Sequence, residues 1–230
     1  RLVRVRTEIS EIRVIGGQER LDCMHIIAVF GGSRVPEGSA AYREAYELGR
    51  RLALAGYTVA NGGYQGTMEA LSRGAAEAGG HVIGVTSDMF DPLPPTPWLT
   101  EERRTPDLYT RLQTFISIAD GFIALRGGVG TLTEVMLTWG LLQTGQLSPR
   151  PFILLGGNWR RIVDGFEQHT DMGPSILALA QVAGTVEEAI SLLREWDHVG
   201  AGLAPAPEGG LKRSPLPLEK TLPMPMRPPA

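Results

Sequence analysis

The sequence predicts an α/β fold in which a Rossmann-like, doubly wound parallel sheet carries helices on both faces. Aliphatic runs of four to six residues alternate with Ala-, Leu- and Glu-rich segments of ten to sixteen residues. This alternation is typical of βαβ units. Three of the short runs also end in glycine-rich turns, as strands that carry a ligand site at their carboxyl ends do.

Six strands are expected, in the spatial order 3-2-1-4-5-6. They cover residues 25–30, 57–60, 81–86, 121–125, 151–155 and 181–183. Residues 87–104 contain four prolines and are expected to form a long loop, because proline can neither donate to a strand ladder nor continue a helix.

Helix boundaries are indicated by capping residues. A helix over 39–55 starts at Ser39 and stops before Gly56, and a helix from 105 to about 119 has Pro106 at its first position. The last helix opens with a capping box from Thr185 to Glu188. The other expected helices cover residues 66–78, 131–142 and 159–169.

The chain divides into three regions. Residues 1–22 are an N-terminal arm or an extra edge strand, and residues 23–200 form the Rossmann-like nucleotide-binding domain. Residues 201–230 hold eight of the seventeen prolines and are expected to be a flexible or extended tail. A proline-rich ligand for a partner domain is the alternative for this tail.

Composition excludes several classes of protein. A net charge of −3 does not favour nucleic acid or an anionic membrane as a partner. The single cysteine, Cys23, excludes a multi-cysteine metal site, and no pair of the four histidines has metal-ligand spacing, so no metal is expected. No apolar run reaches the roughly 18 residues of a membrane span, and no secretory signal is visible. A cytoplasmic protein is the simplest interpretation.

The positions of the two lysines exclude two further classes of protein. Lys212 and Lys220 are the only lysines, and both lie near the C-terminal end of the sequence. A pyridoxal-phosphate enzyme needs a core lysine for its Schiff base, and a Walker A loop needs a lysine at the start of a helix. We therefore expect neither chemistry, and no cofactor.

The three glycine-rich turns predict an anion site. Glycine lets the backbone approach a phosphate closely, and the following helix presents free N–H groups and its positive dipole end. The alternative is that these glycines only make tight turns. A dinucleotide motif is not present, because Thr133 stands where its third glycine would be. The candidate phosphate-binding residues are Gly32, Ser33, Gly63, Gly66, Thr67, Gly127, Gly128, Val129, Gly130 and Thr131.

Residues 127–134, Gly-Gly-Val-Gly-Thr-Leu-Thr-Glu, match the G-G-x-G-T-x-x-E motif of the LOG (Lonely Guy) family, which the chain resembles over about residues 25–196. The resemblance also includes the glycine turns after the first two strands. It implies a phosphoribohydrolase that cleaves cytokinin nucleoside 5′-monophosphates, and a homodimer. Many relatives carry an older label as lysine decarboxylases, which the scarcity of lysine contradicts.

The resemblance further implies that Arg111 and Glu134 are the catalytic pair. Glu134 would reach the ribose of a nucleotide whose phosphate lies at the helix start, and Arg111 would contact the phosphate or orient the carboxylate. The chain departs from the family pattern at Arg126, where proline is usual, and at Thr110 and Leu112, where an acid and a lysine are usual.

Two functions follow from this sequence. The first is hydrolysis of the N-glycosidic bond of a purine nucleoside 5′-monophosphate such as AMP, releasing the base and ribose 5-phosphate. The second is a binding or carrier protein for a nucleotide or a phosphorylated cofactor, on the same fold but without turnover.

Overall fold

The computed structural model describes residues 25–200 and contains one seven-stranded parallel sheet. The strand order is β4-β3-β2-β1-β5-β6-β7, so the doubly wound α/β fold class is confirmed. The expected arm at 1–22 and the expected tail at 201–230 lie outside the described residues, as do residues 23 and 24. The strands are β1 (Ile26–Phe30), β2 (Thr58–Asn61), β3 (Val82–Ser87), β4 (Glu101–Thr105), β5 (Gly121–Ala124), β6 (Phe152–Leu155) and β7 (Gln181–Ala183).

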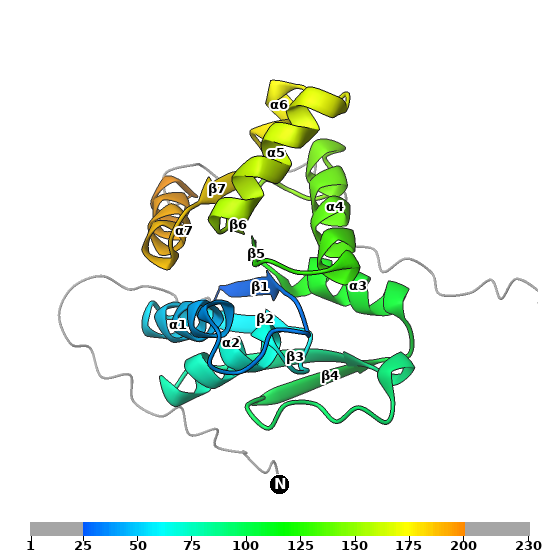
Figure 1. Ribbon diagram of the computed structural model, residues 1–230, viewed down its shortest axis with the longest axis vertical. Coiled ribbons are helices and arrows are strands. Elements are labelled where there is room, and N and C mark those ends of the chain that lie inside the picture. Colours follow the sequence, from blue (N-terminus) through cyan, green and yellow to red (C-terminus); the bar gives the residue numbers. More distant parts are fainter. Residues whose placement is uncertain (1–24, 201–230) are drawn as a thin grey trace, which may run out of the picture.

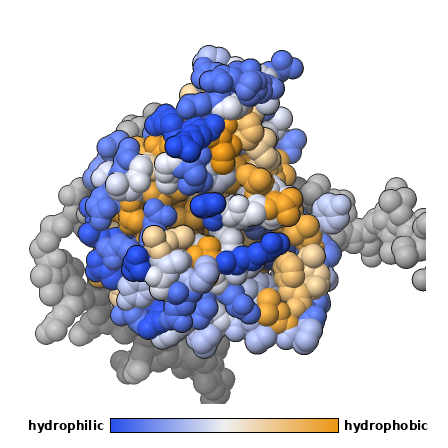
Figure 2. All heavy atoms as spheres, in the orientation of Figure 1, coloured by the Kyte–Doolittle hydropathy of each residue, from blue (hydrophilic) through white to orange (hydrophobic). Residues whose placement is uncertain are grey.

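Helices cover both faces of the sheet (Figure 1). One face carries α1 (Ala40–Leu54), α2 (Thr67–Glu77) and α7 (Val186–Gly200). The other carries α3 (Leu108–Ile118), α4 (Val129–Gln143), α5 (Gly157–His169) and the short α6 (Pro174–Leu177). Each face has its own apolar core, and the five inner strands between them are almost fully buried, as parallel strands with two covered faces must be. On the surface, apolar side chains gather over α3 and α4 (Figure 2).

The strand order places a switch point at the centre of the sheet. β1 pairs with β2 on one side and with β5 on the other, where Phe30 is aligned with Ala124. The chain winds outward in opposite directions from these two strands. Ligands of such sheets bind beyond the carboxyl ends of the strands at this point.

The expectation of a long loop over 87–104 was wrong in its second half. Residues 101–105 form β4, which extends the expected six-strand order at its edge by pairing with β3. Four of its five residues are charged, so no apolar alternation indicated a strand. Such a sequence can form a strand at an edge, where four of the five side chains remain at least partly exposed to water. Residues 88–90 form a single 3₁₀ turn, η1 (Asp88–Phe90).

The expected caps are mostly confirmed. Ser39 accepts a hydrogen bond from the Tyr42 N–H, and the Thr185 hydroxyl accepts one from the Glu188 N–H. Pro106 was wrongly expected inside a helix. β4 runs to Thr105, and Asp107 is the N-cap of α3.

Two more helix assignments needed correction. α4 begins at Val129, two residues before the expected start. The single turn α6 was not expected at all, because four residues carry no helical periodicity.

Glycine brings α1 and α2 unusually close together. A Cβ on Gly49 would lie 2.1 Å from the Leu71 carbonyl oxygen, and one on Gly74 would lie 2.0 Å from the Tyr46 carbonyl oxygen. Backbone therefore packs against backbone at both crossings. This contact sets how closely α1 and α2 pack on their face of the sheet.

We expect Gly74→Ala to lower the free energy of unfolding by about 1–3 kcal/mol, because the added methyl group overpacks this contact. Alanine is the better helix former, so helix propensity alone predicts the opposite sign. Gly165→Ala in α5 is the matched control, since a Cβ there meets no atom within 4 Å. Urea unfolding of both variants measures the effect, and equal stability of the two would contradict this account.

Candidate active site

The three glycine-rich turns meet beyond the carboxyl ends of β1, β2 and β5. A Cβ on Gly31 would lie 2.2 Å from Thr67 Oγ1, and a Cβ on Gly32 would lie 3.3 Å from the Gly127 Cα. The Gly32 carbonyl also accepts hydrogen bonds from the Thr67 N–H at 3.0 Å and from its hydroxyl at 3.1 Å. Glycine at 31 and 32 is thus what lets the first turn pack against the other two.

The second turn is engaged within the chain. Gly63 donates its N–H to Asn61 Oδ1 at 2.8 Å, and its carbonyl accepts from the Thr96 N–H at 2.8 Å. Gly66 is buried against the first turn, with Ser33 and the Gly32 carbonyl beside it. Gly63, Gly66 and Thr67 therefore shape the site and support its other turns, while Ser33 is exposed at its mouth.

The third turn is open to solvent. Gly128 is the N-cap of α4, and residues 127–130 are all exposed. Thr131 is buried, and its Oγ1 would lie 2.0 Å from a Cβ on Gly127. A Cβ on Gly128 or Gly130 meets nothing within 4 Å. The helix start therefore presents its first N–H groups to an empty surface, which is the physical requirement for binding an anion.

Arg111 is buried beneath these turns. It projects from α3, and only 7% of its surface is exposed. Its Nε donates to the Val85 carbonyl at 2.8 Å, and its Nη2 lies 3.4 Å from the Gly62 carbonyl oxygen. Gly62 must lack a side chain, because a Cβ there would lie 2.2 Å from Nη2. The carboxyl ends of β2 and β3 thus hold the guanidinium.

Three aromatic rings surround the Arg111 guanidinium. Its Cζ lies 5.4 Å from the ring centroids of Phe90 and Phe115, and 6.0 Å from that of Tyr64. Rings at this distance attract a desolvated cation. Sequence reasoning missed these residues. Tyr64 directly follows a glycine pair and could have been noticed there, whereas nothing in the spacing of Phe90 connects it to Arg111.

Glu134 lies in α4, about one turn after the glycine-rich start. Its side chain is partly buried, and within residues 25–200 its carboxylate forms no hydrogen bond. Burial raises the pKa of Glu134 to about 7, although the positive charge of Arg111 acts in the opposite direction. Burial also lowers the pKa of Arg111, while Glu134 counteracts that change. The structure thus brings both members of the expected pair into electrostatic contact, without a direct ion pair in the described chain.

Two further cations stand at the mouth. Arg34 follows the first turn and Arg126 precedes the third, and both are exposed. Within residues 25–200 neither forms an ion pair. Positive charge at the open turn suits an anionic ligand.

Other site types find no support among residues 25–200. No group of three His, Cys, Asp or Glu side chains in this range could hold a metal ion. None of the helices there is both long enough and apolar enough to cross a bilayer.

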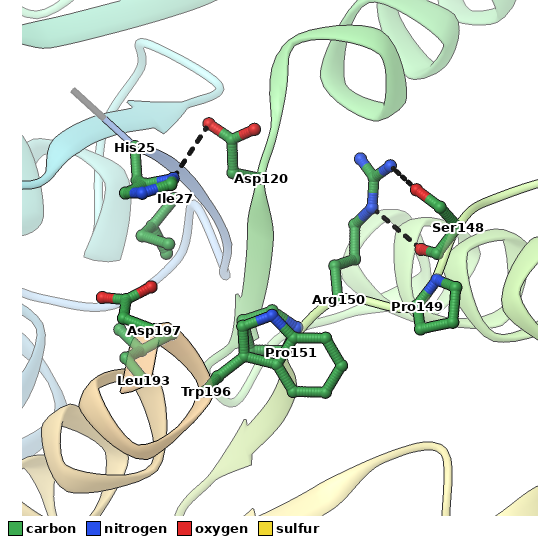
Figure 3. A pocket seen from close by; sticks show the side chains of 10 residues that line it. All are labelled: His25, Ile27, Asp120, Ser148, Pro149, Arg150, Pro151, Leu193, Trp196 and Asp197. Carbon is green, nitrogen blue, oxygen red and sulfur yellow. Dashed lines mark hydrogen bonds and ion pairs between the residues drawn. The ribbon is translucent and has the colours of Figure 1, made fainter. Parts of the chain in front are cut away.

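A separate pocket of about 220 Å³ lies at the opposite end of the sheet (Figure 3). His25 and Asp120, which precede β1 and β5, line it together with Trp196 of α7. Its acids already have partners, because Asp120 accepts from the Ile26 N–H and Asp197 accepts from the Tyr57 hydroxyl. This pocket lacks both a helix start and a glycine turn, so it is not the candidate active site.

Comparison with protein families matches residues 68–193 to the family described as "Possible lysine decarboxylase". The chain is 31% identical over 178 residues to the cytokinin riboside 5′-monophosphate phosphoribohydrolase of Rhodococcoides fascians, covering 73% of this chain and 88% of that protein. It is 30% identical over 195 residues to the pyrimidine/purine nucleotide 5′-monophosphate nucleosidase of Escherichia coli K12. That alignment covers 74% of this chain, but only 42% of the E. coli protein.

Solved structures of similar fold include two proteins whose names refer to the molybdenum cofactor. The molybdenum cofactor binding protein of Rippkaea orientalis superimposes with a TM-score of 0.60 at 27% identity, covering 74% of this chain and 96% of that one. The carrier protein of Chlamydomonas reinhardtii superimposes with a TM-score of 0.59 at 26% identity, covering 76% and 98%.

Glu134→Gln should stabilise the fold at pH 8 and have little effect at or below pH 4.5. The folded chain binds the Glu134 proton more tightly than the unfolded chain, so wild-type stability falls as pH rises from about 4.5 to about 7. Glutamine removes this loss, which is of the order of 3 kcal/mol when complete. Thermal unfolding at both pH values measures the difference. A variant less stable than wild type at pH 8 would show that the ionised Glu134 carboxylate does not destabilise the folded protein.

Proposed function

Because the chain belongs to the family described as possible lysine decarboxylase, which includes the LOG proteins, we propose that it hydrolyses the N-glycosidic bond of a nucleoside 5′-monophosphate. The observation that carries the proposal is that Glu134 and the buried Arg111 interact electrostatically beside an open, glycine-lined helix start. Decarboxylation by a pyridoxal-phosphate mechanism is not supported, because residues 1–211 contain no lysine.

In this proposal the 5′-phosphate binds at the start of α4. The N–H groups after Gly128 and the positive end of the helix dipole would hold it. Gly128 and Gly130 leave room for the phosphate, since a Cβ at either position meets no neighbour. The phosphate supplies binding energy away from the reacting bond, and this energy orients the ribose.

Glu134 would then act at the ribose. Breaking the bond between C1′ and the base leaves positive charge on the sugar, as in glycoside hydrolysis. The Glu134 carboxylate can stabilise that charge, or accept the proton of the water that adds to C1′. A pKa of about 7 suits the second role, because the ideal pKa of a catalytic base lies near the working pH. The products are the free base and ribose 5-phosphate.

Arg111 would supply the positive charge that stabilises the ionised Glu134 carboxylate. Its donors to Val85 and Gly62 fix the guanidinium plane, so little reorganisation is needed when charge develops. A buried, fixed cation keeps part of the Glu134 population ionised against the cost of burial.

A carrier function on the same fold is the second candidate. It is favoured by the structural likeness to two proteins named for binding or carrying the molybdenum cofactor, and by the departures from the family motif at Thr110, Leu112 and Arg126. Incubation of the protein with AMP or an N6-substituted AMP, followed by an assay for free base, separates the two. Release of base supports the enzyme, and binding without release supports the carrier.

We expect Glu134→Gln to keep AMP binding while lowering turnover by about a hundredfold or more, the scale of losing one preorganised electrostatic group. Gly130→Asp should instead abolish AMP binding, because it places a negative charge beside the phosphate while its side chain meets no protein atom. Gly130→Ala is the matched control for added bulk. Calorimetric binding and base release measure the two effects, and an unaltered rate in Glu134→Gln removes the catalytic assignment.

We further propose that the chain forms a homodimer through α3 and α4. Apolar surface covers this side of the molecule (Figure 2). Val129 and Tyr109 are 83% and 85% exposed, and Met136 continues the same side of α4. Contiguous exposed apolar side chains of this kind mark interaction surfaces. Since Val129 belongs to the third glycine turn, the partner would lie at the mouth of the site.

Met136→Glu should convert the dimer to a monomer, because it buries a charge in the proposed interface. Leu54→Glu is the matched control, since Leu54 is an exposed leucine of α1, on the other face of the sheet. Light scattering at micromolar concentration measures the mass of each protein. A wild-type monomer, or a dimer that survives Met136→Glu, contradicts the proposed interface.

A further inference from the structure

The turn after β3 is tethered at both ends by a single arginine. Arg104 of the edge strand β4 donates from Nε to Asp88 Oδ1 at 2.5 Å and from Nη2 to Asp91 Oδ2 at 2.6 Å. Asp88 opens η1, and Asp91 is the residue that follows it. One planar guanidinium therefore spans the turn from its first residue to its last.

Phe90 lies between the two tethered acids and contacts the candidate catalytic arginine. Its ring centroid lies 5.4 Å from the Arg111 Cζ and 5.3 Å from the Tyr64 ring, which it meets edge-on. Tyr64 in turn accepts from the Ser87 N–H at 2.9 Å, and its hydroxyl donates to the Ser87 carbonyl at 3.1 Å. The aromatic cage around Arg111, formed by Tyr64, Phe90 and Phe115, thus includes a residue of the tethered turn.

β4 holds Arg104 beside this turn. In the parallel pairing with β3, Arg104 is aligned with Thr86, and Thr105 is aligned with Ser87. The Thr105 hydroxyl also donates to the Thr86 carbonyl at 2.7 Å. The Val85 carbonyl, which accepts from Arg111, is on the preceding residue of β3. The carboxyl end of β3 therefore lies beside Arg104 and also carries the Val85 carbonyl that accepts from Arg111.

We propose that Arg104 is a positioning residue, which holds Phe90 against Arg111 through Asp88 and Asp91 and so fixes the Arg111 guanidinium relative to Glu134. The expected effect of Arg104 on catalysis rests on the proposed function. The structural half of the proposal, that Arg104 fixes the Arg111 guanidinium, does not. Arg104 and both acids are about half exposed, and exposed ion pairs add little to stability. What the tether supplies is the position of the turn, because a guanidinium fork can bind two carboxylates in one plane and an ammonium cannot.

The structural half is tested by hydrogen exchange of the Arg111 Nε–H, followed by ¹⁵N NMR of the full chain. Arg111→Lys assigns the signal by its loss. This N–H is buried and bonded to Val85, so it should exchange slowly in the wild type. Arg104→Ala should speed its exchange about three- to fivefold, as expected for a lost exposed ion pair. Arg104→Lys should lie between the two, and Phe90→Leu should have the largest effect.

Arg103→Ala is the matched control. Arg103 is the neighbouring residue of β4, but it pairs with Glu101 and not with the turn. In Arg103→Ala, the Arg111 Nε–H should exchange at the wild-type rate. The proposal is overturned if Arg104→Ala leaves the rate unchanged, if Arg103→Ala raises it equally, or if the wild-type signal already exchanges fast.

The catalytic half is tested by steady-state kinetics with AMP on the same proteins. Arg104→Ala should lower kcat about as much as it speeds exchange, with KM unchanged, because Arg104 acts through Arg111 and does not touch the phosphate turn. Faster exchange with no AMP cleavage in the wild type leaves the tether standing and removes the proposed function. Normal kcat in Arg104→Ala, with an active wild type, overturns the positioning role.

Discussion

Burial of the Arg111 guanidinium is the constraint around which the carboxyl end of the sheet is arranged. A cation removed from water must have its donors bonded and its charge balanced. Here the ends of β2 and β3 supply carbonyl oxygens, and aromatic rings supply the remaining surroundings. Gly62 is bare because a Cβ would occupy the guanidinium's place. Several features that look independent in the sequence therefore follow from one buried charge.

Glu134 shows the other side of that arrangement. The carboxylate lies where burial disfavours its charge, and Arg111 compensates only in part, so its pKa is raised. A side chain kept near its titration point has a cost in stability above neutral pH. Such strained groups concentrate at functional sites. The first and second glycine turns, in contrast, are packed against each other and joined by hydrogen bonds between Thr67 and the Gly32 carbonyl. Stability and reactivity are thus assigned to different residues of the same loop cluster.

The sequence predicted six of the seven strands and the meeting of the glycine turns, because apolar runs indicate strands that are buried and parallel strands end at one edge. Arg111 and Glu134 came from a family motif, and spacing alone would not have identified them. The cage and the tether could not be predicted, since Phe90, Tyr64 and Arg104 come from separate segments that only folding brings together. β4 was missed for a related reason: periodicity detects strands that bury an apolar face, and β4 has none. The engaged N–H of Gly63 was equally invisible, because hydrogen-bond partners are not written in a motif.

The charges of β4 have a consequence for the behaviour of the protein at high concentration. An open sheet has two bare edges, and a bare edge is a template on which another molecule's strand can add. One edge here carries Glu101, Glu102, Arg103 and Arg104 in a row, so an incoming strand would have to strip water from four charges. The opposite edge, β7, has only three residues, which offers too short a ladder for lasting addition. Within residues 25–200, both edges of the sheet therefore disfavour the addition of a strand from another molecule.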